Sequence, residues 1–153
     1  MGYLVDCLCD NLAVVTNTGC IAAAALQSDK LDSSVKWGIC IAMQLYAVFF
    51  LAWSNLATAV PDYKSNYHSA LAKWYYGTTA GDAILYLGMQ FCWCGLYLYA
   101  EGTHAWLGKV VTMFTAPLFL LKVAVEVENV GHLTEQVMKN DVDKCIASKQ
   151  KLA

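Results

Sequence analysis

The stretch GTTAGDAILYLGMQFCWCGLYLYA, residues 77–100, decides the fold that this sequence predicts. It is long and apolar enough for a membrane-spanning helix, which needs about 20 residues. Within it, Gly81, Gly88 and Gly95 recur every seven residues, so a helix carries them on one face. A face of small side chains lets a second helix approach closely within lipid. We therefore expect these glycines to pack against another helix.

The opposite face of the same helix carries polar and aromatic side chains at spacings of four, four, three and four residues: Asp82, Tyr86, Gln90, Trp93 and Tyr97. Such a face is poorly suited to lipid. We expect Tyr86, Gln90, Trp93 and Tyr97 to meet a partner subunit or a bound cofactor rather than bulk lipid, so that the helix is covered by protein on two sides.

Composition identifies the class of protein. Hydrophobic residues make up 58% of the 153 residues and charged residues only 14%, whereas soluble domains carry about 25% charged residues. All ten basic residues are lysines. The lack of arginine excludes sites that need a bidentate guanidinium, and with a net charge of −2 it argues against a nucleic-acid partner.

The fold class predicted is all-α, a polytopic membrane protein with about four transmembrane helices. The expected spans are residues 5–27, 35–60, 79–100 and 104–125. A short interfacial helix is expected in the connector after Pro61, where Tyr67, Leu71 and Trp74 share a helical face. We assign residues 1–126 to the bundle and residues 127–153 to a polar, amphipathic C-terminal tail, broken near Gly131 and Asn140.

The turn at residues 101–103 is so short that the third and fourth spans should form an antiparallel hairpin. The fourth span is then the natural occupant of the glycine face. Pro117 removes a backbone hydrogen bond in mid-span and is expected to kink it, with Thr112 and Thr115 bonding the freed carbonyls. Lys122 is expected to extend toward the headgroups and to pair with Glu126 at the membrane rim.

Neutral amides are the polar groups expected inside the membrane: Gln90, Gln44, Asn55 and Asn17. Hydrogen bonds between helices are the favoured explanation. The alternative is a cavity lined by Gln90 and Gln44 that takes a lipid headgroup, a quinone or a pigment. No carboxylate is expected at the centre of a span, which argues against a proton-coupled transporter.

The sequence lacks the common catalytic and phosphate-binding motifs. The sequence has no G-x-S-x-G, no H-E-x-x-H and no phosphate-binding loop. His68, His104 and His132 lie outside the span centres and not at metal-ligand spacing. The cysteines, including Cys92 and Cys94, are interpreted as reduced packing residues, with a thiol enzyme as the weaker alternative. We therefore predict no catalytic residue, no metal and no cofactor.

The function predicted is a non-catalytic accessory (supernumerary) subunit of a multi-subunit membrane complex, of the energy-transducing respiratory type, acting in assembly and helix packing. Its expected partners are other membrane subunits and bound structural lipids. Asp6 and Asp10 in a lysine-free N-terminus argue against a secretory or transit peptide. The mitochondrial inner membrane is favoured, with a thylakoid or other membrane as alternatives. The alternative function is a small transporter, or a lipid- or quinone-binding protein with an amide-lined intramembrane site.

Overall fold

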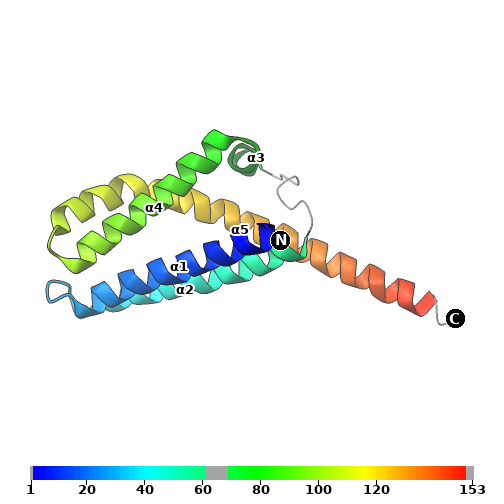
Figure 1. Cartoon of the computed structure of the whole chain (residues 1–153), viewed down its shortest axis with the longest axis horizontal. Coiled ribbons are helices and arrows are strands. Elements are labelled where there is room, and N and C mark those ends of the chain that lie inside the picture. The colour runs from blue at the N-terminus through cyan, green and yellow to red at the C-terminus, as the bar shows by residue number, and fades with distance from the viewer. Residues whose placement is uncertain (1, 61–68, 151–153) are drawn as a thin grey trace.

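The structure, a computed structural model, describes residues 2–60 and 69–150, with side chains described in 8–60 and 69–146. The described residues form α-helices and no strands, as the sequence predicts (Figure 1). The elements are α1 (Gly2–Gln27), α2 (Ser33–Ala59), α3 (Ala70–Gly77), α4 (Thr79–Glu101) and α5 (Ala105–Gln150).

Four of the helices are long and apolar enough to cross a membrane, which confirms a polytopic helical membrane protein. The candidate spans are Leu8–Gln27, Ser33–Ala59, Thr79–Glu101 and Ala105–Ile146. The first three lie within a few residues of the expected spans, because polar turns and Pro61 bound them in the sequence.

The last helix differs from the prediction. α5 is one α-helix of 46 residues that continues through Gly131 and Asn140, so the expected breaks are wrong, whereas the end of the membrane span near residue 125 stays a prediction. A glycine in a helix costs only about 1 kcal/mol, and Leu133 is buried in a cluster with Ala57 of α2 and with Val60, the residue after α2, which stabilises the helix beyond Gly131. At 1.5 Å per residue α5 is about 69 Å long, more than twice the bilayer core of about 30 Å.

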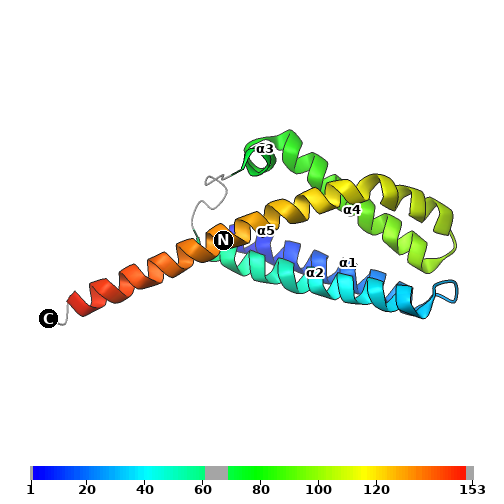
Figure 2. The ribbon, with the colours of Figure 1, turned by 180° about the vertical axis from the view of Figure 1, so that it is seen from behind.

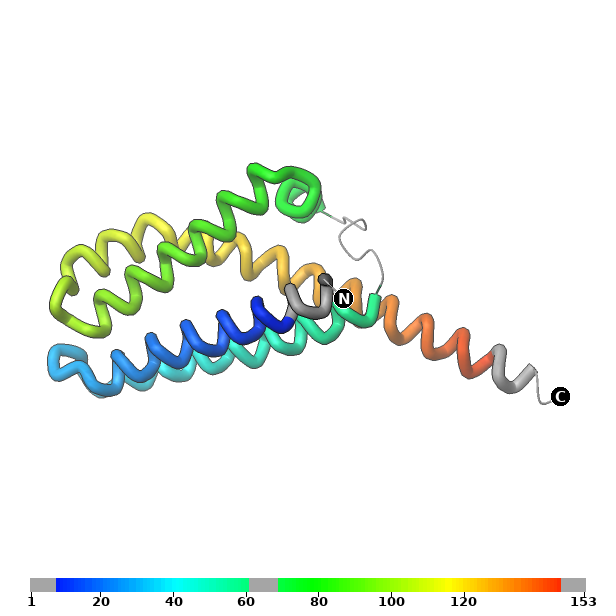
Figure 3. The backbone as a smooth tube through the Cα atoms, viewed as in Figure 1, coloured from blue at the N-terminus to red at the C-terminus, as the bar shows by residue number. Residues whose placement is uncertain are grey.

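The chain forms two hairpins, α1 with α2 and α4 with α5 (Figure 1). Gly102 makes the second turn in the left-handed region, at φ 87°, and its N–H bonds to the Leu98 carbonyl. Lys30 Nζ donates to the Gly102 carbonyl at 2.6 Å, which ties the two turns together at one end of the bundle. Figure 3 shows α4 diverging from α1 toward the other end, where α3 and the N-terminal part of α1 lie.

The interfacial helix α3 is docked on α5. The Ser69 hydroxyl accepts the Ala72 N–H at 3.0 Å and donates to Glu128 Oε2 at 2.7 Å. Asn129 Nδ2 donates to the Tyr76 hydroxyl at 3.1 Å. Burial raises the pKa of Tyr76, so this hydroxyl stays neutral. Tyr67, which began the predicted interfacial helix, lies outside the described residues, whereas the rest of that prediction coincides with α3.

Pro117 lies inside α5, and Figure 2 shows α5 changing direction in its yellow part. A proline removes one helical hydrogen bond and crowds the preceding turn, which accounts for a bend. The Thr115 hydroxyl donates to the Val111 carbonyl at 2.7 Å. The expected contribution of Thr112 is wrong, because its buried hydroxyl has no hydrogen-bond partner among the described residues.

Candidate functional site

The glycines of α4 lie where other helices come closest. A Cβ on Gly88 would meet Leu118 Cβ at 2.5 Å, and one on Gly95 would meet Thr112 Oγ1 at 2.6 Å. Both neighbours belong to α5, so α5 fills this part of the glycine face. Gly81 faces α3 instead, since a Cβ there would lie 2.3 Å from the Trp74 carbonyl oxygen.

The opposite face of α4 is divided. Tyr86 and Tyr97 are 46% and 43% exposed, whereas Trp93 is buried and meets the ring of Tyr46 of α2 edge-on at 5.8 Å. The α1–α2 hairpin of the same chain therefore packs on Trp93, which spacing along α4 does not reveal. The expectation that a partner subunit or bound cofactor meets the rest of this face stays a prediction.

The predicted amide-lined cavity exists in a different form. A cavity of about 470 Å³ opens between α1, α2 and α4, and Gln90 lines it, but Gln44 does not. Gln44 is exposed on the outer side of α2, and the Asn55 amide bonds to the Leu51 carbonyl of its own helix at 2.8 Å. The prediction of a cavity shared by Gln90 and Gln44 is wrong, because Gln44 lies on the face of α2 that points away from the bundle.

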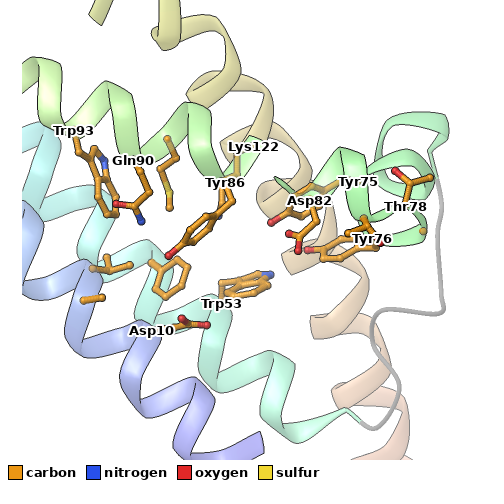
Figure 4. A pocket seen from close by; sticks show the side chains of 16 residues that line it. Asp10, Trp53, Tyr75, Tyr76, Thr78, Asp82, Tyr86, Gln90, Trp93 and Lys122 are labelled. Atoms are coloured by element: carbon orange, nitrogen blue, oxygen red, sulfur yellow. The ribbon is translucent and has the colours of Figure 1, made fainter. Parts of the chain in front are cut away.

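This main cavity is lined by charged and aromatic side chains as well as by Gln90 (Figure 4). Its polar and aromatic lining residues are Asp10, Phe50, Trp53, Tyr75, Tyr76, Thr78, Thr79, Asp82, Tyr86, Gln90, Trp93 and Lys122. They come from all five helices, so the cavity depends on the complete fold. The sequence indicated the α4 face of Asp82, Tyr86, Gln90 and Trp93 but did not indicate that Asp10 and Lys122 line the same cavity.

Lys122 and Glu126 lie inside the bundle, with 4% and 1% of their surfaces exposed. They form an ion pair one turn apart on α5. The expectation that Lys122 extends to the headgroups is wrong, because its side chain is buried in the bundle and paired with Glu126. The sequence analysis also missed that Glu126 is buried, whereas the position of the pair relative to the membrane rim stays a prediction. The residues after Val125 continue the helix against α2 and α3, and this face of α5 therefore points into the protein.

The surroundings of the pair are aromatic. Lys122 Nζ lies 5.7 Å from the centre of the Phe50 ring. The Tyr46 hydroxyl lies near Glu126 but donates to Met89 Sδ at 3.4 Å, and Glu126 Oε2 accepts no hydrogen bond from the described residues. An ionised pair in such surroundings is costly unless each charge neutralises the other. A buried ion pair of this kind marks a candidate functional site.

Cys92 and Cys94 do not form a joint site. Cys92 is buried, whereas Cys94, two residues on, is exposed. The Cys40 thiol lies 3.5 Å from the Ala22 carbonyl, to which it donates. Residues at i and i+2 of a helix point in different directions, so Cys92 and Cys94 do not face one centre.

The described histidines are placed outside the main cavity. His104 precedes the first residue of α5, and His132 is half-buried near Glu135, with 4.0 Å between Nδ1 and Oε2. His68 lies outside the described residues. Within the described part of the chain, no three His, Cys, Asp or Glu side chains form a group that would hold a metal ion.

The main cavity and the buried Lys122–Glu126 pair behind it are thus the candidate functional features of the described residues. Comparison of this chain with protein-family models, with curated proteins and with solved structures finds no match.

Proposed function

We propose that this protein is a non-catalytic accessory subunit of a larger membrane complex, acting in assembly and helix packing. The observation that carries the proposal is the end of α5. From residue 138 to residue 146 every side chain of this helix is exposed, and Figure 1 shows it projecting well beyond the bundle. We call residues 138–146 the C-terminal arm.

The arm has an apolar face. Met138, Val142 and Ile146 are 63%, 56% and 51% exposed and follow one another at four-residue spacing, so they lie on one side of the helix. A single helix with no packed face is marginal in water, and a projecting helix gains stability when its apolar side is covered. A partner protein that packs on this face explains why the helix continues so far.

The membrane-embedded surface is compatible with the same role. Large apolar side chains of α2 point outward, with Leu45 and Val48 66% and 64% exposed. Such a surface suits lipid tails or neighbouring subunits equally well. We include bound structural lipids and other membrane subunits among the proposed partners, and no nucleic acid.

The type of complex is a further part of the proposal. A small polytopic chain without a catalytic motif fits the accessory subunits of energy-transducing, respiratory-type complexes, and we propose the mitochondrial inner membrane as its location. This part is supported by the class of chain alone. Fractionation of the native cells, with the chain followed by an affinity tag, tests it: recovery in a different membrane overturns the location without affecting the role as a subunit.

The role of the arm is tested by placing one charge on either side of it. Val142→Glu inserts a carboxylate into the apolar face, whereas Asn140→Glu inserts the same carboxylate on the opposite side, and both positions are exposed. With the tagged chain extracted in a mild detergent, Val142→Glu should lose its co-purifying subunits and Asn140→Glu should retain them. Equal retention by both variants would contradict docking through the arm.

A second candidate function is ligand binding in the main cavity, as a transporter or as a lipid- or quinone-binding protein. It is favoured by the cavity of about 470 Å³ that reaches Gln90, which lies within the range of known ligand pockets. Binding of a ligand and membership of a complex are compatible. If no small molecule or lipid headgroup binds in this cavity, the second candidate function is contradicted and the role as a subunit is unaffected.

A further inference from the structure

A second cavity, of about 400 Å³, lies between α1 and α4. It shares Gln90 and Trp93 with the main cavity, and Figure 4 shows these two residues as neighbours on α4. From α1 it is lined by Asn17, which the main cavity does not reach. Its volume lies within the range of known ligand pockets, about 300–1,000 Å³. We call it the second cavity.

The amides of Asn17 and Gln90 lie at the same level of the bundle. Asn17 is ten residues before Gln27, where α1 ends. Gln90 is eleven residues before Glu101, where α4 ends. At 1.5 Å per residue each amide is about 15–17 Å from the end of its helix, and Lys30 ties the two turns at these ends together. Both residues are also midway along their candidate membrane spans. A molecule that fills the second cavity therefore reaches both amides.

Three polar groups in the lining of this cavity have no hydrogen-bond partner among the described residues. They are the side-chain amides of Asn17 and Gln90 and the buried Nε1 of Trp93. A polar group midway along a membrane span is unfavourable unless it is hydrogen-bonded, because lipid tails offer no partner. A bound molecule that supplies such a partner would therefore be held here.

The rest of the lining selects a neutral molecule. None of its described residues is an acid, a lysine or a histidine, and a buried charge without a partner is strongly unfavourable. Trp93 and Tyr97 supply aromatic walls, on which a flat ring can stack. Tyr97 and the two cysteines of the lining, Cys20 and Cys94, are exposed. The cavity thus opens at the outer surface of the bundle, where a lipid-soluble molecule can enter.

We infer that the second cavity binds the carbonyl group of a neutral, lipid-soluble molecule, which accepts hydrogen bonds from the amides of Asn17 and Gln90. A carbonyl is favoured because the N–H groups of the lining, with that of Trp93, outnumber its amide oxygens. Two sources share this chemistry, the ring of a quinone and the ester of a neutral glycerolipid. The inference goes beyond both candidate functions, since it concerns a different cavity and holds whether or not the chain is a subunit.

The two cysteines of the lining can report whether the second cavity is occupied. With the full chain in a neutral detergent, N-ethylmaleimide alkylates exposed thiols, and peptide mass spectrometry follows each cysteine separately. A molecule bound in the cavity should protect Cys20 and Cys94. Cys9 is the internal control, because it is exposed but lines neither the main nor the second cavity.

Three probes distinguish the two sources. Decylubiquinone is a fully substituted quinone, dioctanoylglycerol carries neutral ester carbonyls, and hexadecane carries no oxygen. At a concentration about ten times its dissociation constant, a bound probe should slow the alkylation of both lining cysteines roughly tenfold. Protection by decylubiquinone alone identifies a quinone site, protection by dioctanoylglycerol alone identifies a lipid-ester site, and protection by both identifies a site for the carbonyl group of either.

Four variants give the binding its location. Asn17→Leu and Gln90→Leu each remove one amide and should raise the dissociation constant of the probe roughly fivefold, as expected for the loss of one hydrogen bond. Gln44→Leu makes the same change at an exposed amide of α2 and should leave protection unchanged. Tyr86→Leu alters the main cavity but not the second, so it should leave protection unchanged as well. Circular dichroism on each variant verifies that the helices are intact.

Several results would overturn the inference. Neither carbonyl probe protects the lining cysteines, or hexadecane protects them equally well, or Asn17→Leu and Gln90→Leu bind the probes as the unchanged protein does. Protection that is lost in Tyr86→Leu but kept in Asn17→Leu would place the ligand in the main cavity, which contradicts this inference and supports the second candidate function. Since the arm is untouched by these variants, co-purification of partner subunits reports separately on the proposed subunit role.

Discussion

Lys122 and Glu126 form an ion pair one helical turn apart on α5, in the interior of the bundle, with 4% and 1% of their surfaces exposed. Each partner removes the cost of burying the other, since an isolated charge in such surroundings is strongly unfavourable. The pair therefore stabilises this face of α5 against α2 only while both members are present.

Removing one member of the pair should destabilise the protein more than removing both. Lys122→Met leaves the Glu126 carboxyl buried without its cation, and we expect a loss of about 3–5 kcal/mol of stability. Lys122→Met combined with Glu126→Leu fills the same space with apolar atoms, and most of that stability should return. Thermal unfolding in detergent, followed by circular dichroism, measures both.

A matched control for this prediction is Lys109→Met, which removes a lysine from an exposed position of the same helix and should change stability by less than about 0.5 kcal/mol. If the double variant is no more stable than Lys122→Met, the two charges do not compensate each other and the burial of the pair would need another explanation.

Close packing between α4 and α5 predicts that glycine substitutions differ by position. A Cβ on Gly88 would lie 2.5 Å from Leu118 Cβ, an atom fixed close to the backbone of α5. Gly88→Ala should therefore push the helices apart and destabilise the protein by about 1–3 kcal/mol. Gly38→Ala, on α2, meets nothing within 4 Å, so it should be neutral or slightly stabilising because alanine favours a helix. Equal effects at both positions would contradict the packing described.

The docking of α3 should depend on Tyr76. Tyr76→Phe removes the hydroxyl that accepts a hydrogen bond from the buried Asn129 amide, and the loss should be about 1–2 kcal/mol. Protease cleavage near α3 should become faster in this variant. Tyr97→Phe, which removes a hydroxyl at a half-exposed position of α4, provides the comparison and should leave cleavage unchanged.

The same residue predicts a loss of stability in alkali. Burial raises the pKa of Tyr76 above its ordinary value of about 10. Above that pH the unfolded chain releases the proton while the folded protein retains it, so the contribution of Tyr76 is full below pH 10 and is lost as the pH rises toward the raised pKa. Tyr76→Phe should accordingly lose less stability than the unchanged protein on going above pH 10. If stability falls equally in the two proteins above pH 10, burial does not keep the Tyr76 hydroxyl protonated.

The spans were predictable because apolar runs and turn residues bound them, and the α4–α5 hairpin followed from the short turn that ends at Thr103. The seven-residue glycine spacing indicated a packing face but not which helix meets each glycine, and Gly81 packs against α3 rather than against α5. The continuation of α5 was not predictable from Gly131, because its cost is offset by tertiary contacts of Leu133.

The candidate site was only partly predictable for a related reason. The four-residue spacing revealed that Lys122 and Glu126 can pair, but not whether their side of α5 faces lipid, water or protein. The sequence predicts that Gln90 and Gln44 are both intramembrane amides, yet of the two only Gln90 lines the cavity. Asp10 and Asp82 lie near span ends in the sequence, and only the divergence of α4 from α1 places them on one cavity.

The proposal that this chain is a subunit of a larger complex is tested most directly by the mass of the particle purified from native membranes in a mild, neutral detergent. We predict a particle much heavier than the 16.8 kDa chain, containing several different proteins in fixed proportion, that loses this chain when Val142 is replaced by glutamate. A stable, monodisperse monomer of the chain alone, recovered under the same conditions, would contradict the proposal.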